Sequence, residues 1–524
     1  MAGPLEIAAT ALGSGAGKAG VVLAALLAGG AVLARSPRAR AWAMLGALVL
    51  TPVLLLAEVW DTAQVRPLRE DPLLAVLGAL AALAAVGAVA FLFHRRPRLF
   101  PLLAVAALPF RVPIESAGAT VNLLVPLYLV IAAGALAYLV PRLRAGSAGE
   151  PSEDGEPSRT GALEIILLGF VVLYAVQSLY SEDFSRALVQ VVFFYVPFAL
   201  LFGLLLRTRW DRDLVFRCLG VLVVLALVFA SVGFVEYATR DVLLNPRVIR
   251  TNEFSSYFRV NSLFFDPNIY GRFLVVVMLG VTGAMLWSTR RRNVAGAAAL
   301  LLVLWGALLL TLSQSSFGGL LVGLGMLAAL RWSARWTVTL GVLAVALGAA
   351  FVLAFPGVLR LDLKDTDKLN RATSGRVALV EGAAILFTER PVAGWGSGSF
   401  RAVFQDRRDA SRRRATAASH NVALTAAAEQ GAIGLLAYLV LIVVAFRRLL
   451  KGARRDVARA VVAAAFAALV CHTMLYAAFL EDPMAWTLLG VGAALSRPSL
   501  GSPVFRAWRK SDRRTAERVE VAAS

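Results

Sequence analysis

Long apolar runs are the feature that most constrains how this chain can fold. About fifteen such runs, most of them near the ~20 residues that carry an α-helix across a bilayer, follow one another along the sequence. Hydrophobic residues make up 59% of the chain and charged residues 16%, well below the charged share of soluble proteins. Backbone polar groups inside a bilayer must bond internally, and runs of this length do so as helices. The sequence therefore predicts an all-α, polytopic integral membrane protein with about 12–15 transmembrane helices.

The two runs 99–110 and 484–496 are short, and the first contains Pro101 and Pro109, so each is compatible with a tilted, half-crossing or interfacial segment. The full set of predicted spans, by residue number, is 19–34, 41–60, 73–93, 99–110, 120–140, 162–181, 185–206, 213–236, 266–287, 294–311, 315–331, 335–355, 421–446, 456–478 and 484–496.

The arginines predict how these helices are oriented. When the spans are counted in order, all the arginine-rich loops fall on one side of the membrane, which the positive-inside rule assigns to the cytoplasm. This explains the net charge of +20 without nucleic-acid binding. The clusters lie at 35–40, 94–98, 142–144, 207–212, 290–292, 331–335, 447–459 and 506–518.

One large loop is predicted on the opposite, outer face. It carries twelve Lys or Arg against seven Asp or Glu, an excess that suits an anionic lipid or a phosphorylated substrate. The predicted organisation is as follows: N-terminal membrane helices of unassigned role (1–141), a disordered cytoplasmic linker (142–161), core membrane helices (162–355), the outer loop with short amphipathic helices (356–420), C-terminal membrane helices (421–497) and a basic cytoplasmic tail (498–524).

Ser419-His420-Asn421 closes an arginine-rich segment and opens the apolar run that follows. This places His420 at the outer membrane surface near a helix N-terminus, where the helix dipole disfavours a protonated imidazole and leaves a neutral base. The alternative is a histidine that caps the helix or marks the interface. His94 lies in a basic cluster and is expected to be solvated, whereas His472 is expected to pack inside the bundle with a hydrogen bond to a neighbouring helix.

Three arginines outside the cytoplasmic clusters are candidates for binding an anion. Arg376 precedes a short amphipathic stretch, with Ser374 as its possible N-cap, and a guanidinium there can bind phosphate oxygens bidentately. Its alternative role is snorkelling at the interface. Arg259 precedes a span that begins with Asp266 as N-cap and Pro267 as first helical residue. Arg272 follows inside that span and should face the bundle interior or a wet cavity, unless it merely pairs with Asp266.

Other motifs favour structural roles. The alternating glycines of Gly394–Phe400 indicate tight turns rather than an anion-binding loop, because no nucleotide-binding spacing is present. Arg407, Arg408 and Arg412–Arg414 are typical of a solvated or headgroup-contacting face. Cys218 and Cys471 give neither a disulfide framework nor a zinc spacing. With no convergent carboxylates or His/Cys cluster, neither a catalytic metal nor a cofactor is expected.

Taken together, these motifs resemble the O-antigen ligase and O-antigen polymerase family of bacterial membrane glycosyltransferases, over roughly residues 160–500. The resemblance rests on four stretches, which are Arg259–Arg272 with Asp-Pro-Asn-Ile-Tyr-Gly, Thr311–Ser316, Ser374–Arg376 continuing through Pro391 to Gly394–Phe400, and His420-Asn421 with Glu429, Gly431 and Gly434. Gln314 departs from the pattern, since relatives often carry arginine at this position.

The resemblance implies an enzyme of the cytoplasmic membrane that acts on its outer face. It implies transfer of a glycan from a polyprenyl diphosphate carrier to an acceptor hydroxyl, without a metal. Arg259, Arg376 and His420 match the essential residues of the family. Arg259 and Arg376 would hold the diphosphate, with Arg272 as a possible helper, and His420 would deprotonate the acceptor for an inverting displacement. The remaining expected substrate-binding residues are Asn268 and Asn421.

Other functions remain open at this stage. A polysaccharide polymerase or a protein O-glycan transferase would use the same donor and differ only in the acceptor. A flippase for lipid-linked glycans would explain the many helices but not the large outer loop, and a non-catalytic scaffold would not need His420. The sequence identifies neither the sugar nor the acceptor nor the oligomeric state.

Overall fold

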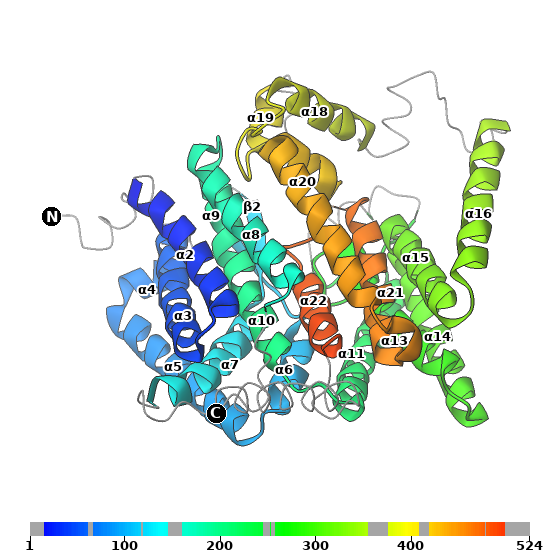
Figure 1. Ribbon diagram of the computed structural model, residues 1–524, viewed down its shortest axis with the longest axis horizontal. Helices are drawn as coiled ribbons and strands as arrows, with labels where there is room; N and C mark the ends of the chain where they lie inside the picture. Colours follow the sequence, from blue (N-terminus) through cyan, green and yellow to red (C-terminus); the bar gives the residue numbers. More distant parts are fainter. Residues whose placement is uncertain are drawn as a thin grey trace, which may run out of the picture.

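The apolar runs form the helices of the protein, which we describe from a computed structural model (Figure 1). The structure describes residues 15–60, 66–116, 119–144, 160–244, 252, 257–354, 376–407, 419–476 and 478–497. Within these residues, ten helices are long and apolar enough to cross a membrane, and three apolar helices are shorter. The all-α, polytopic membrane class predicted from the sequence is confirmed. The linker between 145 and 159, the loop residues 355–375 and 408–418, and the tail from 498 lie outside the described residues.

Among the described residues, the N-terminal part contains six helices and a hairpin. The elements are α2 (Gly15–Leu33), α3 (Pro37–Val59), α4 (Arg66–Glu70), α5 (Pro72–Arg95), α6 (Leu99–Ala107), β1 (Val112–Ser116), β2 (Ala119–Leu123) and α7 (Val125–Arg144). The antiparallel pair β1–β2 occupies part of the span predicted to start at residue 120, so α7 begins only at Val125. Pro113 and the β-branched residues Val112, Ile114 and Val121 favour strand over helix here.

The remaining elements form the rest of the bundle. They are α8 (Ala162–Gln177), η1 (Ser178–Tyr180), α9 (Phe184–Gln190), the π-helical η2 (Val191–Tyr195), α10 (Val196–Arg207), α11 (Arg212–Thr239), α13 (Pro267–Leu286), α14 (Arg291–Thr311), α15 (Gln314–Arg331), α16 (Ala334–Ala354), α18 (Arg376–Glu389), α19 (Phe400–Asp406), α20 (Val422–Leu450), η4 (Ala453–Arg455), α21 (Val457–Thr473) and α22 (Pro483–Leu495).

Several helices begin at an acidic or hydroxyl side chain followed by proline. Asp266 accepts a hydrogen bond from the backbone N–H of Asn268 at the start of α13, and Pro267 is the first helical residue, as predicted. Asp71 and Asp482 start α5 and α22 in the same way. The carboxylate satisfies a free N–H at the helix start, and proline needs no hydrogen bond at that position.

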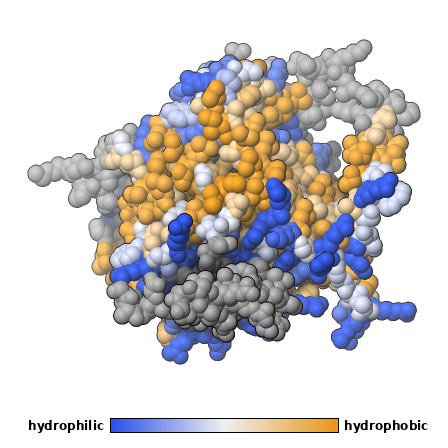
Figure 2. All heavy atoms as spheres, viewed as in Figure 1, coloured by the Kyte–Doolittle hydropathy of each residue, from blue (hydrophilic) through white to orange (hydrophobic). Residues whose placement is uncertain are grey.

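Burial separates the central helices from those that face lipid. In the most apolar stretch of the segment Phe184–Arg207, 83% of the residues are buried. In Leu73–Arg95 the share is only 11%, although this segment is the more apolar of the two. A helix that is this apolar and this exposed to its surroundings is typical of one that faces hydrocarbon. Figure 2 shows the resulting apolar band between hydrophilic residues at the two ends of the bundle.

The arginine clusters gather at one end of the bundle, here called the basic end. The Arg207 guanidinium donates to the carbonyls of Ala31 and Val32, and Arg497 donates to the carbonyl of Leu206 and to Glu164. Other contacts of the same kind join Arg448 to Ala493, Arg454 to Ala329 and Arg331 to Leu286. Helices α13, α15 and α20 all end here, so their first residues lie at the opposite end.

The outer-loop segment Pro391–Phe400 is fastened to a break in α20. Gly431 has φ 65° and ψ −161° inside this helix, which frees backbone groups that the loop then satisfies. The N–H groups of Ala432 and Ile433 donate to the carbonyls of Pro391 and Val392, and those of Trp395 and Gly396 donate to the carbonyls of Ala428 and Glu429. Irregular backbone at membrane depth needs this kind of internal pairing.

The glycines of this segment turn tightly, as predicted. Gly394, Gly396 and Gly398 all have positive φ. The N–H groups of Gly398 and Phe400 donate to the buried carboxyl group of Glu429 within the protein.

We expect Gly396→Ala to destabilise the protein. Gly396 has φ +92°, and an added Cβ would lie 2.3 Å from the Cα of Ser181. Strain of this kind costs about 1–3 kcal/mol before the clash is counted. Thermal unfolding of the purified protein followed by tryptophan fluorescence should show a lower midpoint. Gly78→Ala is the matched control because nothing lies within 4 Å of its added Cβ, and equal midpoints for the two variants would contradict the expectation.

Candidate functional site

His420 lies directly before α20, at the end opposite the arginine clusters. One alternative role for His420 was to cap this helix, but His420 is not the N-cap. Asn421 caps the helix instead, because its Oδ1 accepts from the N–H of Leu424 while its Nδ2 donates to the carbonyl of Met474. His420 has φ 57°, a left-handed conformation that is unfavourable for a bulky residue. Strained backbone of this type gathers at functional sites.

The surroundings of the His420 ring favour the neutral imidazole. Burial lowers the pKa of His420 below its ordinary value, Arg376 lowers it further, and Asp266 acts in the opposite direction. The Tyr476 ring packs beside it, with centroids 6.1 Å apart. A half-buried neutral imidazole next to a cation can accept a proton from a bound substrate.

Arg376 is the first residue of α18, in the outer loop. This helix lies above α20 in Figure 1 and buries Leu379, Ala383 and Leu386 in a small core shared with α19 and α20. The loop thereby brings Arg376 within electrostatic reach of His420, 44 positions away in the sequence. The possible N-cap Ser374 lies outside the described residues.

Asp266 and Arg272 of α13 do not pair with one another, although that pairing was a structural alternative. The phenol of Tyr476 donates to Asp266 over 3.0 Å; burial and Asp266 raise the pKa of Tyr476, which keeps its proton. Arg272 forms a buried ion pair with Asp482, with Nη2 and Oδ2 2.6 Å apart. The guanidinium is therefore partly neutralised by the protein.

Arg259 is tied to this site through a cluster of hydroxyl groups. Its Nε donates to the carbonyl of Thr311 over 3.0 Å, in the turn where Leu312 has φ 49°. The hydroxyl of Ser313 donates to Oδ1 of Asn268 over 2.8 Å, two residues from Asp266. Asn268 thus supports the turn that holds Arg259.

Arg111 joins the site although the sequence analysis did not single it out. It lies between α6 and the hairpin, and its Nε is buried without a hydrogen bond from the described residues. Burial lowers the pKa of Arg111, opposed by Asp482, and Arg272 and Tyr476 lie within electrostatic reach. The only signal in the sequence was an arginine at the predicted outer end of the short run 99–110.

The site is strongly cationic. Arg376 lies within electrostatic reach of His420, and Arg111 and Arg272 lie within reach of Tyr476, whose ring is beside His420. Arg259 is linked to this group through the turn that Asn268 supports. The acidic partners named above are Asp266 and Asp482. A local excess of guanidinium groups with low exposure to water favours a polyanion such as a diphosphate. Within the described residues, no group of three or more His, Cys, Asp or Glu side chains is placed to hold a metal ion.

The other histidine in the bundle has the structural role predicted for it. His472 is 2% exposed, and its Nε2 lies 3.1 Å from the Oγ of Ser315 on the neighbouring helix. Cys218 and Cys471 are free.

The chain is similar to a known protein family over part of its length. Residues 298–439 match the family model described as O-Antigen ligase. The match runs from α14 to the middle of α20 and includes Arg376 and His420, whereas Arg111, Arg259 and Arg272 lie before it. No curated protein matches the chain.

Proposed function

Since residues 298–439 form a domain of the O-antigen ligase family, we propose that this membrane protein transfers a glycan from a polyprenyl diphosphate carrier to an acceptor hydroxyl. The reaction takes place at the end of the bundle that holds His420, which the arginine clusters at the other end assign to the outer face of the cytoplasmic membrane. The observation that carries the proposal is the half-buried, strained His420 held next to Arg376.

The proposed chemistry needs a base and a cationic pocket. His420 takes the proton of the acceptor hydroxyl while that oxygen attacks the anomeric carbon of the donor sugar. The bond from this carbon to the diphosphate oxygen breaks, and its electron pair leaves with the polyprenyl diphosphate. Arg376 and Arg259 stabilise the charge of the leaving group, with Arg272 as a helper. Direct displacement of this kind inverts the anomeric configuration, and no metal takes part.

The proposal is tested by comparing polyprenyl-diphosphate glycans between cells that carry the wild-type protein and cells that carry His420→Ala, at equal membrane levels of the two proteins. Mass spectrometry combined with leaflet accessibility should find the donor accumulating on the outer leaflet, together with loss of the finished glycoconjugate. Accumulation on the inner leaflet would indicate a flippase instead. A finished product that is one acceptor with a long glycan identifies a ligase, whereas a ladder that collapses to single units identifies a polymerase.

We expect the transfer rate to fall at acidic pH. His420 must be unprotonated to act, and its pKa lies below the ordinary value of 6.5. The rate should therefore be constant with respect to this group at neutral pH and decline only as the pH drops below 6.5. Rates of the purified protein in nanodiscs at saturating donor, measured between pH 5 and 8, check this. A decline centred clearly above 6.5 would contradict it.

A further inference from the structure

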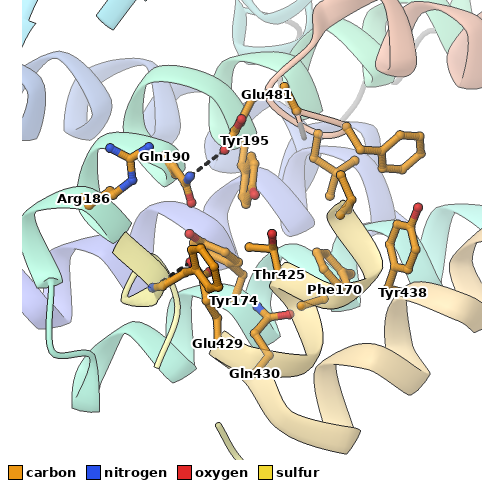
Figure 3. A pocket seen from close by; sticks show the side chains of 16 residues that line it. Phe170, Tyr174, Arg186, Gln190, Tyr195, Thr425, Glu429, Gln430, Tyr438 and Glu481 are labelled. Atoms are coloured by element: carbon orange, nitrogen blue, oxygen red, sulfur yellow. Dashed lines mark hydrogen bonds between the residues drawn. The ribbon is translucent and has the colours of Figure 1, made fainter. Parts of the chain in front are cut away.

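A cavity lies near the arginine-rich site and is chemically different from it (Figure 3). Its volume is about 190 Å³, and it is formed by α8, the α9–η2 segment, α20 and the turn before α22. Two consecutive residues belong to different sites. Glu481 lines the cavity and accepts from Nε2 of Gln190 over 2.5 Å, whereas Asp482 pairs with Arg272.

Two residues of the cavity wall carry buried polar atoms that no described residue bonds. Oε1 of Gln430 and the hydroxyl of Tyr174 are buried without a hydrogen bond from the described residues, and these two residues are 1% and 4% exposed. Buried polar groups in proteins are nearly always hydrogen-bonded, so a small shift of either side chain toward the cavity would let a ligand there satisfy the free atom. Both residues line the cavity in Figure 3.

The lining combines aromatic walls with hydrogen-bonding side chains. Tyr174, Tyr195 and three phenylalanines supply flat apolar faces. The charged lining residues are two carboxyl groups, Glu429 and Glu481, and one arginine, Arg186. This balance is the reverse of the arginine-rich site, so it does not suit a diphosphate. Carboxyl and amide groups beside aromatic rings instead suit an uncharged ligand with many hydroxyl groups and apolar C–H faces.

The size and position of the cavity fit a sugar. Its volume equals roughly six water molecules, comparable with a single sugar ring. Thr425 at its half-buried rim shares a 2.6 Å hydrogen bond with Ser419, the residue before His420. The π-helical turn η2 joins the two lining residues Gln190 and Tyr195, and π-helical turns are frequent at functional sites.

We propose that this cavity binds one uncharged sugar unit of a reacting glycan. The inference rests on the proposed function and deepens it by assigning the diphosphate to the arginines and the sugar to the carboxyl-lined cavity. The sugar belongs either to the donor or to the acceptor, and the kinetics of the two substrates distinguish these sources.

The test uses Glu481→Gln, which keeps the shape of the side chain and removes its charge. Transfer by the purified protein in nanodiscs is measured while donor and acceptor are varied separately. Loss of a hydrogen bond to a charged group should raise one KM about tenfold and leave kcat nearly unchanged. A rise in the donor KM alone assigns the cavity to the donor sugar, and a rise in the acceptor KM alone assigns it to the acceptor.

Glu58→Gln is the matched control, because Glu58 is also a half-buried carboxyl with a side-chain hydrogen bond, to Ser185, but does not line the cavity. Tyr195→Phe is the second variant should Glu481→Gln fail to fold, since it keeps the aromatic ring and removes only a hydroxyl from a lining residue. Unchanged KM values for both substrates in a folded cavity variant would overturn the inference.

A binding measurement separates this inference from the proposed function. Wild-type protein in nanodiscs is titrated with the glycan-bearing polyprenyl diphosphate and with sugar-free polyprenyl diphosphate. If the cavity holds the donor sugar, the glycan-bearing lipid binds more tightly, and Glu481→Gln removes only this difference. If the cavity instead holds the acceptor sugar, the two lipids bind equally well, and the acceptor KM of Glu481→Gln is the measurement that tests the inference. If the His420→Ala protein keeps this difference in binding and still transfers at the full wild-type rate, the sugar site stands and the proposed mechanism fails.

Discussion

Replacing His420 with alanine should lower the transfer rate by about 10²–10⁴-fold, the usual contribution of a general base. The acceptor hydroxyl is a poor nucleophile until its proton is removed, and no other histidine is placed to remove it. His472 is buried against Ser315, and His94 is exposed at the end of α5. The rate is measured with the purified protein in nanodiscs at saturating donor and acceptor.

The left-handed backbone of His420 provides a sharp control. If the residue served only to adopt φ 57°, glycine or asparagine would replace it without loss, since both tolerate this conformation. We expect His420→Gly and His420→Asn to fold and yet to be as inactive as His420→Ala, because neither side chain accepts a proton. His94→Ala should retain the wild-type rate. Full activity of the glycine variant would make His420 structural.

The membrane architecture could be predicted because length and polarity alone decide it. Apolar runs of about 20 residues leave few alternatives to transmembrane helices. The start predicted at 120 was misplaced because β-branched residues and proline interrupt the pattern there, and the span predicted at 456–478 ends earlier, at Thr473. Local capping rules also predicted Asp266 and Pro267 correctly. Applied to Asn421, the same rules would have identified it as the cap of α20.

Contacts between distant segments could not be predicted from the sequence. Nothing in the glycine-rich loop indicates that its N–H groups bind Glu429, which is 31 residues away. Arg111 stands in the irregular chain between two predicted spans, and only the folded bundle brings it near Asp482. The acidic cavity has the same origin, because its carboxyl groups come from α20 and from the turn before α22. The roles of Arg259, Arg376 and His420 in transfer remain predictions.

Neutralising Arg376 in Arg376→Gln should lower the rate about 10²–10³-fold, as removal of one group that stabilises transition-state charge typically does. It should also change the pH dependence. The positive charge of Arg376 lowers the pKa of His420, so its removal raises that pKa, and the acidic decline of the rate moves to higher pH.

Arg376→Lys separates the two effects of this residue. Lysine keeps the charge near His420, so the acidic decline should stay where it is in the wild type. The rate should still fall, because an ammonium group cannot bind two phosphate oxygens as a guanidinium does. Rates of all three proteins across pH 5–8 test both statements. A pH profile that is unchanged in Arg376→Gln would show that Arg376 does not act on His420, and the paired arrangement of base and phosphate-binding cation would have to be abandoned.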